Sequence, residues 1–176
     1  MALNEVGEGS IMALTEDSKA GRLCNQFYAL TRDMVLRAHP WNFATKRVEL
    51  AQLTETPAFD FDHQFQLPAD CLKVQKTDDD RDIFKVEDGM LLSNNAVVKI
   101  VYTRRIEDTT KFDSLFVETL YLEIAAKIVF NLSDNNALSQ TLFAKAKDKI
   151  SQAKSMDGQE GIVDVVEADT WLNSRF

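Results

Sequence analysis

Residues 96–132 read AVVKIVYTRRIEDTTKFDSLFVETLYLEIAAKIVFNL and contain the two clearest structural signals in the sequence. Apolar side chains recur at every second position from Val98 to Tyr102, which predicts a β-strand over residues 96–103. Residues 114–132 are instead apolar almost all round, and four polar positions in them step by four: Thr119, Glu123, Lys127 and Asn131. This spacing predicts a helix with a narrow polar, solvent-facing stripe, on which Glu123 and Lys127 can form an ion pair. Such a helix is central in its bundle or is covered by a neighbouring subunit.

A second long helix is predicted upstream, over residues 16–39. Thr15 is its expected N-cap, acidic residues occupy its first turn, and Pro40 stops it because the residue before a proline resists the helical conformation. The positions that recur at helical spacing are Ala20, Leu23, Cys24, Phe27, Leu30, Thr31, Met34, Val35 and Ala38.

The residues between these helices, about 44–106, have the pattern of short strands. Phe65 and Leu67 alternate with glutamines, 71–76 and 84–86 are strand-like, and Asp88-Gly89 is a strong hairpin signal. This region is predicted to be an antiparallel meander or a small sheet.

Helices return at Asp113, which is the expected N-cap of a helix over 113–132. A third helix is expected over 134–156, capped by Ser133 or Asp134 and ended by Asp157-Gly158. The predicted fold is therefore α+β and mainly α: a helical bundle with an inserted antiparallel β-rich part. We expect a single domain over residues 1–157 and an extended C-terminal arm over 158–176.

Composition narrows the function classes. The chain has 176 residues, 45% of them hydrophobic, and 20 basic against 28 acidic residues give a net charge of −8. An acidic chain is repelled by phosphates, so specific DNA binding is not expected, although DNA could slide past it. No stretch approaches the ~20 apolar residues that span a bilayer, and the first 14 residues do not resemble a signal peptide. Cys24 and Cys71 stand far apart and are interpreted as free thiols of a protein assembled inside the cell.

The sequence offers no clear catalytic or ligand-binding motif. His39 and His63 form no metal-binding pair, with His39 expected at a helix end and His63 solvated between strands. The sequence contains neither a nucleophile elbow nor a glycine-rich phosphate loop. Asp78-Asp79-Asp80 with Asp82 lacks the spacing of a calcium loop and is interpreted as a turn. No pair of carboxylates stands out for glycoside hydrolysis. The candidates are Glu5 and Glu8, Asp60 and Asp62, and Glu107 and Asp108.

Aromatic residues gather in one part of the sequence, and their interleaved charges are mainly acidic. They are interpreted as core packing rather than as a single-strand-binding groove: Trp41, Phe43, Phe59, Phe61 and Phe65.

Five segments, taken together and in order, resemble the tail tubular protein A family of head-to-tail adaptors from short-tailed bacteriophages. They are LNEVGE (3–8) followed by Ile11 and Leu14; AHPWNFA (38–44); FQLPADCLKV (65–74); VYTRRIED (101–108) leading to Phe112, Asp113 and Phe116; and WLNSR (171–175). The family pattern has a longer helix before the Gly7-Glu8 pair, of which only a stub is present here.

The resemblance implies a structural virion protein without enzymatic activity or cofactor. It implies a homo-oligomeric ring of twelve copies between the portal protein and the tail nozzle protein, with a lumen through which DNA passes. Such a protein is assembled in the host cytoplasm and is found in the portal-proximal part of the tail, with no membrane partner.

Two other classes of function stay open. One is a cell-wall hydrolase associated with a phage tail, and the other is an intracellular assembly or binding module unrelated to phage. For the C-terminal arm we expect a partner-binding role, because large aromatic side chains are typical interface anchors. The alternative is an arm folded back on its own bundle. The candidate binding residues are Trp171, Leu172, Arg175 and Phe176.

Overall fold

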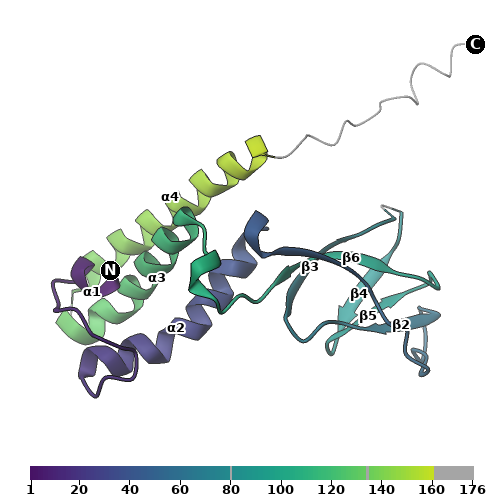
Figure 1. Cartoon of the computed structure of the whole chain (residues 1–176), viewed down its shortest axis with the longest axis horizontal. Helices are drawn as coiled ribbons and strands as arrows, with labels where there is room; N and C mark the ends of the chain where they lie inside the picture. Colours follow the sequence, from purple (N-terminus) through teal and green to yellow (C-terminus); the bar gives the residue numbers. More distant parts are fainter. Residues whose placement is uncertain (80, 134, 161–176) are drawn as a thin grey trace, which may run out of the picture.

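The computed structural model describes residues 1–79, 81–133 and 135–160 and has the predicted α+β fold, with 46% helix and 20% strand. Its helices are α1 (Ala2–Glu5), α2 (Lys19–Ala38), α3 (Ser114–Ser133) and α4 (Asn136–Glu160), with short 3-10 turns η1 (Asn42–Ala44) and η2 (Thr109–Lys111). Its strands are β1 (Thr45–Glu49), β2 (His63–Gln66), β3 (Cys71–Thr77), β4 (Phe84–Glu87), β5 (Met90–Ser93) and β6 (Lys99–Arg104). The helices form one lobe and the strands another, so the molecule is elongated (Figure 1).

Helix α3 is the centre of the helical lobe. It packs against α1, α2 and α4, and Ser139 of α4 donates from its hydroxyl to the Ala126 carbonyl 2.7 Å away. Farther along, Lys149 Nζ lies 2.6 Å from Glu118 Oε2, which sets α4 antiparallel to α3. Most of the apolar surface of α3 is thus buried inside its own subunit, so its composition does not require a neighbouring subunit.

The helix ends differ from the predictions where side chains compete for the cap. Helix α2 begins after Ser18, whose hydroxyl accepts from Gly21 N at 3.0 Å, and not after Thr15. Asp113 is confirmed as the cap of α3, since its Oδ1 accepts from Leu115 N at 2.8 Å. The observed cap of α4 is Asn135, whose Oδ1 accepts from Leu138 N at 3.0 Å. Of the two predicted caps, Ser133 still belongs to α3 and Asp134 lies outside the described residues.

The C-terminal end of α4 also lies beyond the predicted stop. Asp157-Gly158 does not end the helix, which continues to Glu160. One glycine without a left-handed turn or a following proline is tolerated inside a helix, at a cost of about 1 kcal/mol.

The β lobe consists of two three-stranded antiparallel sheets, with strand orders β1-β6-β3 and β2-β5-β4. The predicted antiparallel pairing is confirmed, but of the two alternatives the meander is wrong, because β6 pairs with β1 and β3 and not with its neighbour in the sequence, β5. The predicted hairpin is confirmed between β4 and β5. Asp88 and Gly89 both have positive φ, 46° and 73°, as a two-residue hairpin turn requires.

The two sheets share one core, which explains the alternation in the sequence. Its buried members are Leu50, Phe65, Leu67, Leu91, Val98, Ile100 and Tyr102. The strand predicted over 96–103 begins only at Lys99, and Val97 is 61% exposed.

Candidate interaction surfaces

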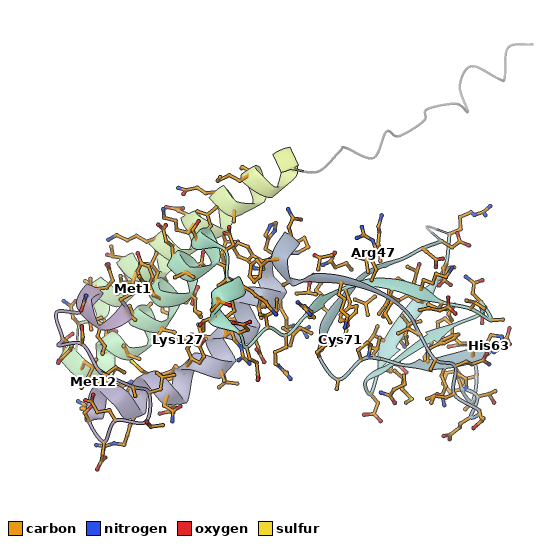
Figure 2. All side chains as sticks on the ribbon, in the orientation of Figure 1. Met1, Met12, Arg47, His63, Cys71 and Lys127 are labelled. Carbon is orange, nitrogen blue, oxygen red and sulfur yellow. The ribbon has the colours of Figure 1, made fainter. Side chains whose placement is uncertain are left out.

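The two histidines lie in different lobes and each has a packing partner. His39 ends α2 as predicted, is buried, and packs edge-on against Trp41 at 5.0 Å between ring centroids. His63 is not between strands but opens β2, half-buried, with its Nδ1 3.0 Å from Gln52 Nε2. It lies at the far end of the β lobe (Figure 2). The two imidazoles therefore do not share a site.

The two cysteines are free thiols in different environments. Cys24 is buried in the helical lobe, and Cys71 is half-buried near the joint between the lobes (Figure 2). Burial raises the pKa of both thiols, and the nearby Asp70 carboxylate raises the pKa of Cys71 further. A raised pKa keeps a thiol protonated at neutral pH and makes it a weak nucleophile.

The aspartates of the 78–82 segment are used by the fold, apart from Asp80, which lies outside the described residues. Asp78 Oδ1 accepts from Lys99 N at 3.3 Å, and Asp79 Oδ1 accepts from Arg81 N at 3.0 Å. Asp82 Oδ1 accepts from the Ser93 hydroxyl at 2.7 Å. Within residues 1–79, 81–133 and 135–160, no three acidic, histidine or cysteine side chains gather as metal ligands would.

The aromatic residues predicted to pack as one cluster divide between the lobes. Trp41 is 2% exposed, its indole N–H donates to the Val35 carbonyl at 2.9 Å, and its ring meets Phe116 edge-on at 5.4 Å. Phe43 joins the same group, whereas Phe65 belongs to the β core. The prediction is wrong for Phe59, which is 76% exposed on the β lobe.

An ionic network joins α2 to the end of β6. Arg105 Nε lies 2.8 Å from Asp33 Oδ2, and Arg32 Nη2 lies 2.9 Å from Asp33 Oδ1 and 3.5 Å from Glu107 Oε1. The side chain of Arg32 is only 7% exposed, so Asp33 compensates a charge that water hardly reaches. We call Arg32, Asp33, Arg105 and Glu107 the joint network.

A second contact crosses the same joint. Arg37 donates to the Leu72 carbonyl, and the Tyr102 hydroxyl donates to Asp70 Oδ1 at 3.0 Å. Burial and this hydrogen bond raise the pKa of Tyr102 to about 12. The hydrogen bond from Arg37 crosses the joint, whereas the one from Tyr102 fixes β6 to the turn before β3 within the β lobe.

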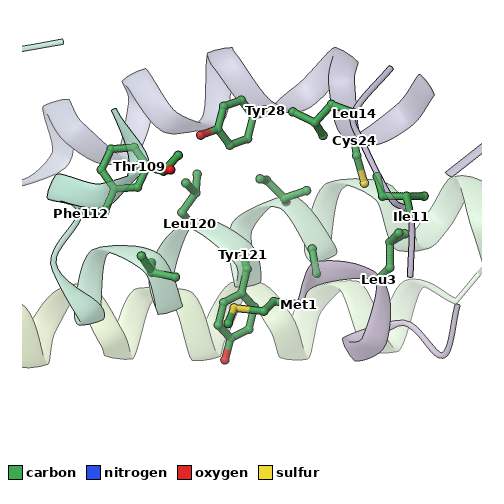
Figure 3. A pocket seen from close by; sticks show the side chains of 13 residues that line it. Met1, Leu3, Ile11, Leu14, Cys24, Tyr28, Thr109, Phe112, Leu120 and Tyr121 are labelled. Carbon is green, nitrogen blue, oxygen red and sulfur yellow. The ribbon is translucent and has the colours of Figure 1, made fainter. Parts of the chain in front are cut away.

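An apolar pocket of about 310 Å³ opens in the helical lobe, between α1, α2 and the start of α3. Figure 3 shows its walls, with the Cys24 sulfur and the Tyr28 ring turned into it. The lining residues are Met1, Ala2, Leu3, Ile11, Leu14, Cys24, Tyr28, Thr109, Phe112, Val117, Leu120, Tyr121 and Ile124. We call this cavity the helical pocket. Its predominantly apolar walls fit an apolar or aromatic group better than a charged one.

A separate apolar patch lies where α2 and α3 run side by side. Leu30 and Met34, one turn apart on α2, are 72% and 41% exposed. Lys127 Nζ lies 3.7 Å from Met34 Sδ and donates to the Thr31 hydroxyl at 3.0 Å. Phe130, 49% exposed, follows Lys127 by one turn of α3. We call Leu30, Met34 and Phe130 the α2–α3 patch.

Leu30 and Met34 belong to the positions that recur at helical spacing on α2, yet the structure leaves both of them exposed. Helical spacing identifies the apolar face of a helix. When that face is wider than the surface of the helix packed against it, the side chains at its margin stay exposed. The width of the apolar face of α2 is the feature of the sequence that could have predicted this exposed patch. The four predicted binding residues, Trp171, Leu172, Arg175 and Phe176, lie outside the described residues.

Comparison with known proteins identifies no family. No protein-family model matches the sequence, and no curated protein matches it either. In the described part of the chain, no helix is long and apolar enough to span a membrane.

Proposed function

We propose that this protein is a structural subunit of a bacteriophage head-to-tail adaptor, assembled as a ring between the portal protein and the tail nozzle. The observation that carries the proposal is the α2–α3 patch. Three large apolar side chains on one helical edge, each at least two-fifths exposed, are the kind of surface that a partner covers.

A ring requires that this patch meets a different surface of the next copy. Contacts between unlike surfaces repeat from subunit to subunit and close into a ring when the rotation allows it. The number of copies that we propose, twelve, comes from the family resemblance. The apolar side chain of Phe59, which is 76% exposed on the β lobe, offers further surface for a partner above or below the ring.

The charge of the chain supports passage of DNA rather than its retention. A net charge of −8 makes phosphate binding unfavourable, so a lumen lined by such subunits would not hold a moving duplex.

Mass measurement of the purified protein, alone and with portal rings, tests the proposal. A ring-sized species with the portal, seen by electron microscopy, is expected for the native protein. Leu30→Asp should abolish the ring, because it places a carboxylate in the α2–α3 patch. Ile83→Asp, an equally exposed site on the β lobe, is the matched control and should still form rings. A protein that remains monomeric with portal present contradicts the proposal.

The C-terminal segment is proposed to bind the portal in the assembled particle, through Trp171, Leu172, Arg175 and Phe176. Deletion of residues 158–176 should leave the helix content near that of the full chain while docking to the portal is lost. Unchanged docking affinity of the truncated protein would refute this role.

A further inference from the structure

The helical pocket is accessible from the surface, and its walls are mainly apolar. Water in such a cavity finds few hydrogen-bond partners, so an apolar occupant is favoured. Tyr28 and Thr109 supply hydroxyl groups on one wall, and Figure 3 shows the two oxygens on the same side of the cavity. A matching occupant is therefore a large apolar group with one polar atom, which describes an indole ring.

The chain itself carries such a group beyond α4. Residues 161–176 read GIVDVVEADTWLNSRF, with Trp171 as their only tryptophan. The other tryptophan of the chain, Trp41, is already buried in the core.

Helix α4 carries the chain past the level of the pocket, so a segment that fills the pocket has to turn back after α4. The contacts of Ser139 with Ala126 and of Lys149 with Glu118 make α4 antiparallel to α3. Helix α4 therefore ends beyond the start of α3, on the side where Thr109 and Phe112 line the pocket.

The length of the segment suffices for the return. At 1.5 Å per residue, Glu160 lies about 20 Å along the helix axis from the level of Leu120. The eleven residues 161–171 span about 36 Å when extended. Trp171 can thus reach the pocket of its own chain with length to spare for the reversal.

We propose that in the free subunit the helical pocket seats the Trp171 indole of the same chain. The tether favours this occupant over a second copy, because a connection of this length gives an effective concentration in the millimolar range. The inference does not depend on the proposed function, since it concerns the subunit before any partner is met.

Cys24 provides the test, because its thiol lines the pocket and should be shielded by the indole. In a Cys71→Ser background, the full-length protein is treated with a small maleimide and the rate at Cys24 is measured. Trp171→Ala should raise this rate at least tenfold. Asn173→Ala, two residues away in the same segment, is the matched control and should leave it unchanged.

Two further measurements keep the outcome unambiguous. Trp171→Ala retains Trp41 as the only tryptophan, so a blue-shifted emission verifies that the core is intact. In a second variant, Trp171→Cys in the same Cys71→Ser background, the protein is oxidised at low concentration. An intramolecular disulfide between Cys24 and the introduced thiol supports the proposal, whereas a disulfide-linked dimer, no crosslink, or an unchanged maleimide rate overturns it.

Discussion

One carboxyl of the helical lobe, that of Glu123 on α3, is half-buried. Its position among helices raises its pKa, and the ammonium of Lys127 opposes this only in part. A carboxyl whose pKa is raised by folding favours the folded state at low pH. That contribution is complete below the unfolded pKa and is lost as the pH rises through the folded pKa.

Glu123→Gln should therefore raise the melting temperature at pH 7, where the native carboxylate is charged and half-buried. The gain should shrink as the pH is lowered toward 4, because the native carboxyl becomes protonated and then resembles the glutamine. Thermal melts at the two pH values measure this, with Glu8→Gln on the exposed N-terminal segment as control. A melting temperature lowered at pH 7 would show that the carboxylate is stabilised by an interaction instead.

Trp41 carries the packing of the residues that connect α2 to the β lobe. Trp41→Ala removes an almost fully buried ring and its hydrogen bond to Val35, which costs roughly 3–5 kcal/mol. At about 2–4 °C per kcal/mol for a chain of this size, the melting temperature should fall by about 6–20 °C. Trp41→Phe should recover part of this loss, and an unchanged melting curve would contradict the structural role.

For single residues, the sequence predicted the role of several side chains correctly, but it did not predict how exposed others are. The structural role of Trp41 and the free thiols of Cys24 and Cys71 agree with the structure. The exposure of Leu30 and Phe59 was missed, because a single side chain's burial depends on what the other elements leave uncovered.

The elements with a strong hydrophobic period were predicted to within a few residues, but the residues that cap their ends were mostly not. The spans of α2, α3 and the β4–β5 hairpin follow from local patterns. The start of α2 depends on a close backbone contact that the hydrophobic periodicity of the sequence does not indicate. At Gly21 an added Cβ would lie 2.4 Å from the Glu16 carbonyl oxygen, so the preceding turn crosses the helix too closely for any other residue.

Gly21→Ala tests which of two opposing effects dominates. Alanine favours a helix over glycine by about 1 kcal/mol, but the clash is with backbone and cannot be relieved by a side-chain rotation. Overpacking of this kind costs about 1–3 kcal/mol, so a net loss of stability in a urea titration is expected. Gly9→Ala, with open space around its Cβ position, should be near neutral. A stabilised Gly21→Ala variant would refute the close approach.

For the whole molecule, the sequence did not predict which strands and which charged residues pair when they are far apart along the chain. The α+β class and the order helix, strands, helices were predicted, but the division of the strands into two sheets was not. The pairing of β6 with β1 joins residues 50 to 58 positions apart, and nothing local specifies it. The joint network likewise unites Arg32 and Asp33 with Arg105 and Glu107.

The joint network should couple the two lobes energetically. Among the described residues, Asp33→Ala leaves the Arg32 guanidinium, 7% exposed, with Glu107 at 3.5 Å as its remaining carboxylate partner. Because that partner remains, we expect a loss of roughly 3 kcal/mol, at the low end for breaking a buried pair. Glu87→Ala, which breaks the exposed pair with Lys85 in the β4–β5 hairpin, should leave the melting temperature nearly unchanged.

A double-mutant cycle separates coupling across the joint from local damage. Asp33→Ala and Arg105→Ala, made singly and together, should be non-additive by about 0.5–3 kcal/mol in the free energy of unfolding, as expected for residues in one ionic network. The pair joins α2 to the residue after β6, so this interaction energy belongs to the contact between lobes and to neither lobe alone. Additive losses, within about 0.5 kcal/mol, would mean that the lobes are held by the packing around Trp41 and that the ion pair contributes nothing to their connection.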